Sequence, residues 1–244
     1  METSAYIALS RQTALRRQMA VVANNLANMN TPAFKGQNMM FVAHVVKSQG
    51  TESFMPTKLS YTRDVSQYTN LSEGPALPTG NKLDVAIKGD GYFVFESPDQ
   101  EVYSRNGRFR LDSGGQLVNQ QGFPVLSDAG TPLIFGPTDT EITISRDGTV
   151  STNNGDLGRI RIVMFEDEQR LKREAGGLYT SEQEPEDEEA PTLVQGALEG
   201  SNVEPILELT KMIETHRAFE STRKLIDRED SRQKQMIQKL GPRG

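Results

Sequence analysis

The residues of this chain that could carry out chemistry are few. The chain contains only two histidines, His44 and His216, which lie far apart in the sequence, and it contains no cysteine. A metal site needs several nitrogen, sulfur or oxygen ligands that converge on one point, and two distant histidines do not supply such a set. A single histidine on a helix is more often a packing or surface residue. We therefore predict no metal site and no cofactor.

Carboxylates offer the other route to chemistry. Asp84 and Asp90 are close in sequence, and Asp90 lies between Gly89 and Gly91. Two carboxylates suffice for the hydrolysis of a sugar chain, and Asp and Gly also open calcium-binding loops. The further Asp, Asn and Glu positions of a calcium loop are missing, however, and sequence spacing alone does not bring two carboxylates together. We interpret the segment as a turn and expect that the protein is not an enzyme.

The elements around these residues are predicted to be short strands. Residues 83–87 and 92–95 flank the Gly-Asp-Gly turn, which predicts a hairpin. Residues 102–105 and 108–111 flank Asn106-Gly107, which predicts a second hairpin with a type I′ turn, because Asn and Gly tolerate the positive φ angles that this turn requires. Further strands are expected near residues 116–119, 124–126, 141–144 and 159–165. This spacing suggests an all-β sandwich or barrel.

Both ends of the chain are predicted to be helical. Residues 5–29 carry a narrow apolar stripe with alternating spacings of three and four, which is the heptad pattern of a coiled coil. Ser4 could cap this helix and Pro32 stops it. The stripe consists of Ala5, Ala8, Gln12, Leu15, Met19, Val22, Leu26 and Met29. Such a narrow stripe favours another helix as its partner.

The C-terminal helix, residues 204–240, carries a second heptad stripe. Asn202 is a plausible cap at its start. The stripe consists of Met212, Phe219, Ile226 and Leu240, widened by Leu209, Ile213, Leu225, Met236 and Ile237. Between the N-terminal helix and the β region, residues 39–46 suit either a strand or a short helix, and residues 50–56 suggest a loop. Gly and Pro residues in 71–81 mark the border of the β domain.

Composition excludes two classes of partner. Lys and Arg number 27 against 33 Asp and Glu, and six of these acids lie within residues 182–189. Outside that run the charges balance, so no basic surface for nucleic acid is expected. The acidic run itself suggests a solvated loop. No segment approaches the ~18 apolar residues of a membrane-spanning helix, and the N-terminus does not follow the pattern of a cleaved signal peptide. We therefore expect neither direct membrane insertion nor removal of a leader.

One sequence word is more specific than these patterns. Residues 23–35 read Ala-Asn-Asn-Leu-Ala-Asn-Met-Asn-Thr-Pro-Ala-Phe-Lys, which resembles the N-terminal signature of the bacterial flagellar axial family, the rod and hook proteins. The family commonly has glycine at the position of Ala33, so a positive φ angle is less expected there.

The resemblance continues along the chain. Residues 83–93, 103–109 and 115–119 are similar to the middle β domain of the rod and hook proteins, and residues 198–204, 212–214 and 217–220 are similar to their C-terminal helix. Residues 6–12 and 203–206 resemble the proximal rod members more than the distal ones.

This resemblance implies a fold and a division of the chain. The fold is expected to be α+β, with N- and C-terminal helices that form a coiled-coil-like inner domain and an all-β middle domain inserted between them. We expect an N-terminal axial helix and signature loop in residues 1–35, a connecting region in 36–81, and the β-rich domain in 82–180. An acidic loop and return linker in 181–200 and the C-terminal axial helix in 201–244 complete the chain.

The resemblance also implies a function. The chain is expected to be a structural subunit of the flagellar basal-body rod in the periplasm, which polymerises helically with copies of itself and other rod proteins and transmits torque. Export by the flagellar type III apparatus is implied as well. The expected assembly interface comprises Leu15, Met19, Val22, Asn24, Asn25, Leu26, Ala27, Asn28, Met29, Phe34, Leu209, Met212, Ile213, Phe219 and Ile226. A distal rod or hook-type subunit, a secreted β-rich binding module and a wall-cleaving enzyme remain as alternatives.

Overall fold

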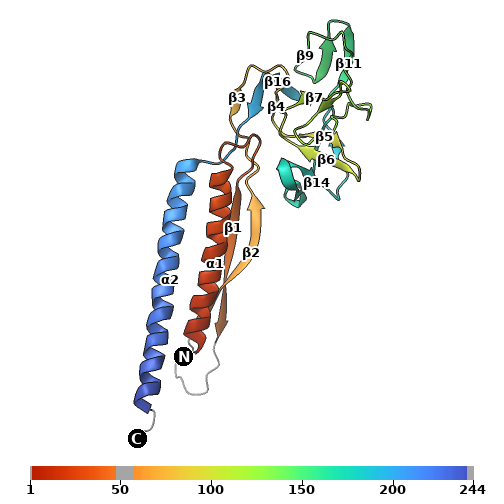
Figure 1. The fold of residues 1–244 in the computed structure, drawn as a ribbon. Coiled ribbons are helices and arrows are strands. Elements are labelled where there is room, and N and C mark those ends of the chain that lie inside the picture. The colour runs from red at the N-terminus through yellow and green to blue at the C-terminus, as the bar shows by residue number, and fades with distance from the viewer. Residues whose placement is uncertain (1, 48–57, 241–244) are drawn as a thin grey trace. The chain divides into compact units, whose positions relative to one another are not determined.

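The computed structural model describes residues 2–47 and 58–240 and shows an α+β fold with an N-terminal helix, a β-rich middle and a C-terminal helix (Figure 1). The chain separates into two compact units, each built from distant segments. The first, here called the helical unit, comprises Met1–Ala27, Gln37–Asn70 and Glu204–Gly244. The second, here called the β unit, comprises Asn28–Gly36 and Leu71–Val203. The signature loop thus belongs to the β unit.

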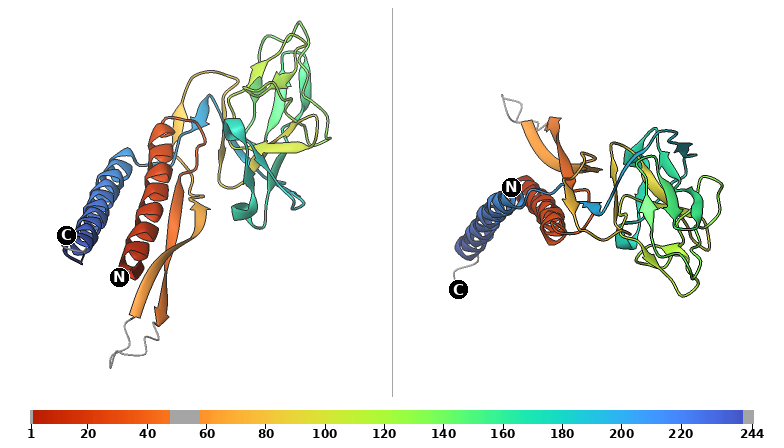
Figure 2. Two further views of the ribbon diagram at one scale, coloured as in Figure 1. Left: turned by 60° about the horizontal axis from the view of Figure 1, so that its bottom comes forward. Right: turned by 90° about the horizontal axis from the view of Figure 1, so that it is seen from above.

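The helical unit contains two helices and a hairpin. Helix α1 (Glu2–Ala27) lies beside helix α2 (Pro205–Leu240) on one side and beside the hairpin of β1 (Gln37–Lys47) and β2 (Lys58–Thr69) on the other (Figure 2). The segment 39–46, for which strand and helix both remained open, is therefore a strand. It pairs with β2 in antiparallel register, with an irregularity between Met40 and Phe41. The loop expected at residues 50–56 lies outside the described residues.

The ends of both helices differ from the sequence prediction. Helix α1 already includes Ser4, so Ser4 does not cap it, and the helix stops at Ala27 instead of continuing to Met29. The chain turns there because the Thr31 N–H donates to the carbonyl oxygen of Asn28, which closes a tight turn before Pro32 is reached. Helix α2 begins at Pro205, a residue that suits the first helical turn because it has no N–H to leave unpaired.

The β unit is built around one antiparallel sheet of six strands, in the order β13-β14-β6-β5-β12-β15. These strands are β13 (Lys172–Arg173), β14 (Tyr179–Thr180), β6 (Glu101–Ser104), β5 (Tyr92–Glu96), β12 (Ile162–Met164) and β15 (Glu186–Asp187). Strand β15 lies within the acidic run, which therefore contributes an edge strand of this sheet.

Smaller sheets complete the β unit. Strand β4 (Val85–Lys88) pairs with β16 (Thr192–Gln195), β3 (Ala76–Pro78) with β17 (Ala197–Glu199), and β7 (Arg110–Leu111) with β8 (Leu117–Val118). A three-stranded sheet contains β9 (Thr143–Ile144), β10 (Thr149–Thr152) and β11 (Gly155–Arg159), and two short 3₁₀ helices span Glu168–Arg170 and Ala175–Gly177. Residues 181–200, expected as an acidic loop and return linker, thus contain three strands.

Both predicted hairpins are wrong in their pairing. The Gly-Asp-Gly turn is present, with positive φ angles at Gly89 and Gly91, but β4 and β5 on either side of it pair with other strands. At Asn106-Gly107 the glycine does not have a positive φ angle, so the turn is not of type I′. Glycine is needed there for another reason: a Cβ atom would collide with the carbonyl oxygen of Val85, which passes directly beside it.

The core of the β unit is aromatic and β-branched. Phe93 and Phe95 of β5 are completely buried and lie in the largest hydrophobic cluster, together with Phe109. The rings of Phe93 and Phe109 meet edge to face with centroids 5.0 Å apart, a preferred arrangement of aromatic pairs. Alternate residues Tyr92 and Val94 point into a second cluster. Strand β5 is thus buried on both faces, which explains its unbroken apolar run.

Candidate assembly interface

The N-terminal part of the expected interface is partly covered within one chain. Val22 of α1 is buried, whereas Leu15, Met19 and Leu26 are half-buried. The positions at the end of the helix differ from one another: Asn24, Ala27 and Met29 are exposed, Asn28 is half-buried, and Asn25 and Phe34 are buried. The stripe therefore retains apolar surface beyond what the single chain covers.

On α2, the stripe that faces inward is half polar. Met212, Phe219 and Ile226 are half-buried, as a heptad contact with one neighbouring helix would leave them. Glu208, Thr215 and Thr222 alternate with these residues at intervals of seven and are 5%, 4% and 7% exposed. Leu209 and Ile213 belong to the exposed surface of α2. The side chains of Ala5, Ile237 and Leu240 lie outside the described residues.

A buried asparagine connects three elements of the helical unit. The side-chain amide of Asn25 donates to the carbonyl oxygen of Gln37 at 2.8 Å and accepts from the Gln37 N–H at 2.9 Å, as a neighbouring strand would. Its Nδ2 also donates to the Glu208 carboxylate at 3.1 Å, and Lys211 Nζ donates to the other carboxylate oxygen at 2.6 Å. Asn25 therefore fixes the end of α1 to the start of β1 and of α2.

The signature loop is anchored in the β unit. The Ala33 N–H donates to the carbonyl oxygen of Glu199, and the Asn202 N–H donates to that of Phe34. The Phe34 ring is buried, and the Arg173 guanidinium lies 4.2 Å from its centroid, within the range of a cation–π contact. Ala33 has a φ of 58°, which contradicts the expectation that alanine would avoid a positive angle there. The two backbone hydrogen bonds on either side of this bend hold the residue in that conformation.

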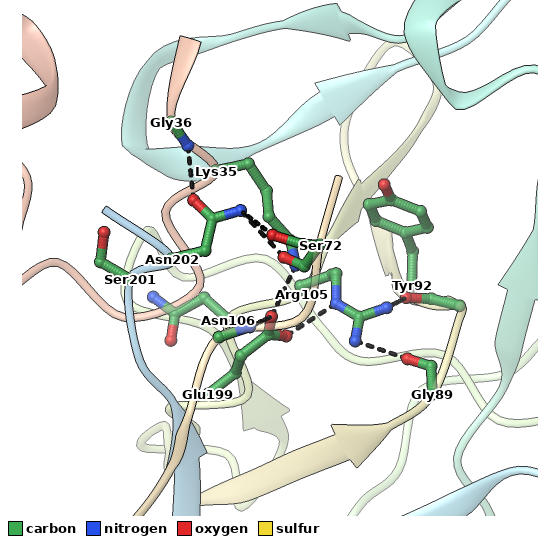
Figure 3. A network of polar contacts seen from close by, with 12 residues as sticks. Lys35, Gly36, Ser72, Gly89, Tyr92, Arg105, Asn106, Glu199, Ser201 and Asn202 are labelled. Atoms are coloured by element: carbon green, nitrogen blue, oxygen red, sulfur yellow. Dashed lines mark hydrogen bonds and ion pairs between the residues drawn. The ribbon is translucent and has the colours of Figure 1, made fainter. Parts of the chain in front are cut away.

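Beside this loop lies a buried cluster of three charged side chains, Lys35, Glu199 and Arg105 (Figure 3). Lys35 Nζ lies 2.7 Å from Glu199 Oε1, and Arg105 Nε lies 2.7 Å from Glu199 Oε2. All three side chains are at most 5% exposed. The N–H of Gly74 adds a third donor to the carboxylate, at 3.0 Å. One carboxylate thus joins the signature loop, strand β17 and the end of strand β6.

The remaining donors of the cluster are also used. Arg105 donates from its two terminal nitrogens to the carbonyl oxygens of Gly91 and Gly89, and Lys35 donates to that of Ser72. Burial by itself raises the pKa of Glu199, but the Arg105 and Lys35 charges outweigh burial and hold this pKa below its usual value. The carboxylate is therefore ionised at neutral pH and holds Lys35 and Arg105 through its ion pairs.

Asn202, which follows strand β17, also binds the signature loop and the neighbouring Ser72. Its Oδ1 accepts from the N–H of Gly36 at 2.8 Å, and its Nδ2 donates to the carbonyl oxygen of Ser72 at 2.9 Å (Figure 3). The prediction that Asn202 caps α2 is therefore wrong, because its side chain is used to bind the signature loop.

Sequence reasoning did not single out Lys35, Arg105 and Glu199. Each of them nevertheless lies inside one of the segments that resemble the rod and hook proteins, residues 23–35, 103–109 and 198–204. Three ionisable residues of complementary charge in three such segments are a signal for a buried ion cluster, although spacing along the chain gives no indication that they meet.

The residues considered for chemistry lie in different surroundings. Asp84 is buried and accepts from the Asn81 side chain, whereas Asp90 is exposed in its turn. His216 is exposed on α2, and the side chain of His44 lies outside the described residues. Within the described part of the chain, no group of three His, Asp or Glu side chains is placed to hold a metal ion. No helix in the described ranges is long and apolar enough to cross a membrane.

Three family models match the chain in order along its length. Residues 6–35 match the model described as flagella basal body rod protein, and residues 86–152 match the flagellar hook protein FlgE/F/G D1 domain. Residues 194–239 match the flagellar basal body rod FlgEFG protein C-terminal model. The first and third models cover α1 with the signature loop and most of α2, and the second covers much of the β unit.

Full-length relatives carry the same description. The chain is 36% identical to the flagellar basal-body rod protein FlgF of Caulobacter vibrioides, with 99% of each chain covered. It is 32% identical to FlgF of Mesorhizobium japonicum, again with 99% of each chain covered. A flagellar basal-body rod protein FlgG of Buchnera aphidicola is 32% identical, with 98% of this chain and 99% of the relative covered. With matches over its whole length, the chain belongs to the family of the flagellar basal-body rod protein FlgF and is a structural rod subunit of the flagellar basal body.

Proposed function

We propose that this rod subunit polymerises helically with copies of itself and with other rod proteins to form the proximal part of the drive shaft that transmits torque across the periplasm. The observation that carries the proposal is that the two terminal helices pair with each other and still expose apolar side chains. They meet in one antiparallel pair, since Asn25 near the end of α1 contacts Glu208 near the start of α2. Yet large apolar side chains of both helices remain exposed.

We propose further that α1 and α2 form a coiled-coil-like inner domain into which the β unit is inserted. The alternation of buried and half-buried residues on α2 at heptad spacing supports this arrangement. Separate compact units for the helices and for most of the strands support the insertion. In an assembled rod, the terminal helices of neighbouring subunits would bury their remaining apolar surface against one another.

The helices are proposed to become ordered on assembly. A narrow apolar stripe stabilises an isolated helix poorly, because nucleation is costly and much of the stripe stays wet. Termini that fold only on binding also suit passage through the flagellar type III export apparatus, which is proposed to deliver the chain to the rod. The proposed role needs no catalysis.

Deletion of the gene in the native bacterium tests this function. Isolated basal bodies should then retain the rod parts that assemble before this subunit and lack those that assemble after it, and swimming should stop until the wild-type gene is returned. Normal basal bodies and normal swimming in the deletion strain would contradict the proposed role. Degradation of cell wall by the purified protein in a zymogram would favour the wall-cleaving alternative instead.

A further inference from the structure

The sequence contains two Asn-Gly pairs, Asn106-Gly107 and Asn154-Gly155. Such a pair is able to modify itself without an enzyme, because glycine has no side chain that keeps its backbone nitrogen away from the asparagine side chain. Which pair reacts in the folded protein depends on how freely the backbone around it moves. The two pairs have opposite surroundings in this fold.

The first pair is enclosed by the core of the β unit. Gly107 is buried, and a Cβ atom at this position would lie 1.8 Å from the carbonyl oxygen of Val85 and 2.9 Å from the ring of Phe93. The Gly107 carbonyl oxygen accepts from the Val85 N–H at 2.9 Å, and Asn106 Oδ1 accepts from the Arg108 N–H at 3.2 Å. A reaction between Asn106 and Gly107 therefore requires local opening of the core.

The second pair lies at the tip of the hairpin that joins β10 and β11. Residues 153–157 are all exposed. A Cβ atom at Gly155 would contact nothing beyond the two chain neighbours of this residue within the described part of the chain. The Asn154 side chain is held at the surface, where its Nδ2 donates to Asp139 Oδ1 at 2.6 Å and to the Oγ1 of the exposed Thr138 at 3.0 Å. A turn held by such surface contacts opens at a low cost in free energy.

We propose that Asn154 is a site of spontaneous deamidation. The backbone nitrogen of Gly155 attacks Cγ of Asn154: a new N–C bond forms, the Cγ–Nδ2 bond breaks, and the proton of the Gly155 N–H leaves with the amide group as ammonia. Water then opens the imide ring. Hydrolysis at Cγ leaves aspartate, whereas hydrolysis at the backbone carbonyl carbon of residue 154 leaves isoaspartate, in which the main chain continues through the side chain.

The reaction changes the contact that the amide makes. The hydrogen bond from Asn154, followed by that from the Gly136 N–H, holds the pKa of Asp139 below its usual value, so this carboxylate is ionised at neutral pH. After deamidation, a second carboxylate faces Asp139 where a donor stood before. Like charges at this distance repel, which weakens the attachment of residues 136–140 to the hairpin tip.

Mass spectrometry tests the site, with the two Asn-Gly pairs compared in one sample. The full chain is incubated at neutral pH, folded or in urea, and digested at acidic pH, and the conversion of amide to carboxyl is followed in the peptides that carry Asn106 and Asn154. In the folded chain, Asn154 should convert at least about tenfold faster than Asn106, since the reaction at Asn106 waits for opening of the core. In urea the two rates should converge. Asn154→Gln is the matched control: it keeps an amide, but its longer side chain closes a ring slowly, so position 154 should stay unmodified.

Two results would overturn the site. One is equal or faster conversion of Asn106 in the folded chain. The other is an Asn154 that stays intact in the folded chain over the time in which the chain in urea is converted.

The structural consequence is tested with Asn154→Asp, which has the sequence of one product. Its thermal midpoint at neutral pH should lie about 2 °C below that of the wild type. The difference should shrink below about pH 4, where the two facing carboxylates take up protons. An unchanged midpoint at neutral pH would overturn the weakened attachment of residues 136–140.

Discussion

At the scale of single residues, Glu199 makes the contacts that join the signature loop, strand β17 and the end of strand β6 within the β unit. Its carboxylate receives Lys35, Arg105 and the N–H of Gly74, while its backbone oxygen receives the N–H of Ala33. A buried ion cluster is costly to break from one side, because the remaining charges lose their partner without regaining water.

Glu199→Gln should therefore destabilise the β unit by about 3 to 5 kcal/mol, since two buried cations would face a neutral amide. Urea unfolding followed by tyrosine fluorescence measures this. The matched control is Glu101→Gln, which removes an ion pair with Arg161 at a carboxylate that is 40% exposed and should cost less than about 1 kcal/mol. Equal effects of the two substitutions would contradict the role given to the buried cluster.

The same substitution predicts a dependence on pH. The pKa of Glu199 lies below its usual value, because Arg105 and Lys35 outweigh the effect of burial, which by itself raises it. A carboxyl of this kind stabilises the fold above its unfolded pKa of about 4.3, and the contribution disappears as the pH falls through the folded pKa. The difference in unfolding free energy between wild type and Glu199→Gln should thus be constant near pH 7 and shrink below about pH 4. A difference that does not change with pH would rule out an ionised Glu199.

Ala33 offers a prediction of opposite sign. A left-handed conformation costs a non-glycine residue about 1 to 2 kcal/mol, so Ala33→Gly should stabilise the β unit by about 1 kcal/mol despite the added freedom of the unfolded chain. Ala129→Gly, at an exposed turn position with negative φ, is the control and should destabilise slightly. Thermal unfolding compares the two, and a lower midpoint for Ala33→Gly would show that the bend is not strained.

At the scale of elements, the signature loop and the helix that precedes it behave as parts of different units. Phe34 and Lys35 are buried in the β unit, whereas α1 ends at Ala27 in the helical unit. A loop fixed by the aromatic and ionic contacts of a large core does not depend on whether the adjoining helix is folded.

Amide hydrogen exchange on the purified monomer should distinguish the signature loop from the helices. If the helices become ordered only on assembly, N–H groups along α1 and α2 should exchange rapidly, while those of Ala33 and Asn202, which donate across the junction, should stay protected. The β5 N–H groups serve as the protected reference within the same sample. Strong protection along α1 in the monomer would refute assembly-coupled folding, and rapid exchange at Ala33 would refute an anchored loop.

At the scale of the whole molecule, the division into two units predicts that assembly and stability can be damaged separately. Leu26→Asp puts a carboxylate on the half-buried stripe of α1, where an unpaired charge costs several kcal/mol once a neighbouring helix covers it. Swimming should fail while the urea midpoint of the β unit remains unchanged. Thr13→Asp, on the exposed side of α1, is the control and should support swimming. Normal swimming with Leu26→Asp would remove the helical stripe from the proposed interface.

The sequence predicted the elements of this molecule better than their partners. Heptad spacing located both helices, and short apolar runs located β4 to β9 and β12, because these patterns are local. Strand pairing was missed at Gly107, where glycine serves a close approach to Val85 and not a turn. The ion cluster was missed because Lys35 and Glu199 are 164 positions apart in the sequence, and local patterns do not show which distant residues meet. Family resemblance, which compares whole segments, captured the function that local patterns could not.

The polar stripe of Glu208, Thr215 and Thr222 on α2 has a consequence for alignment. Two purely apolar helices could slide past each other by one heptad and lose little. In this pair, such a slip would place Asn25 opposite Thr215 and leave the Glu208 carboxylate buried without its amide partner, at a cost of several kcal/mol. The polar stripe thus fixes the register of α1 against α2, at the expense of apolar contact area between the two helices.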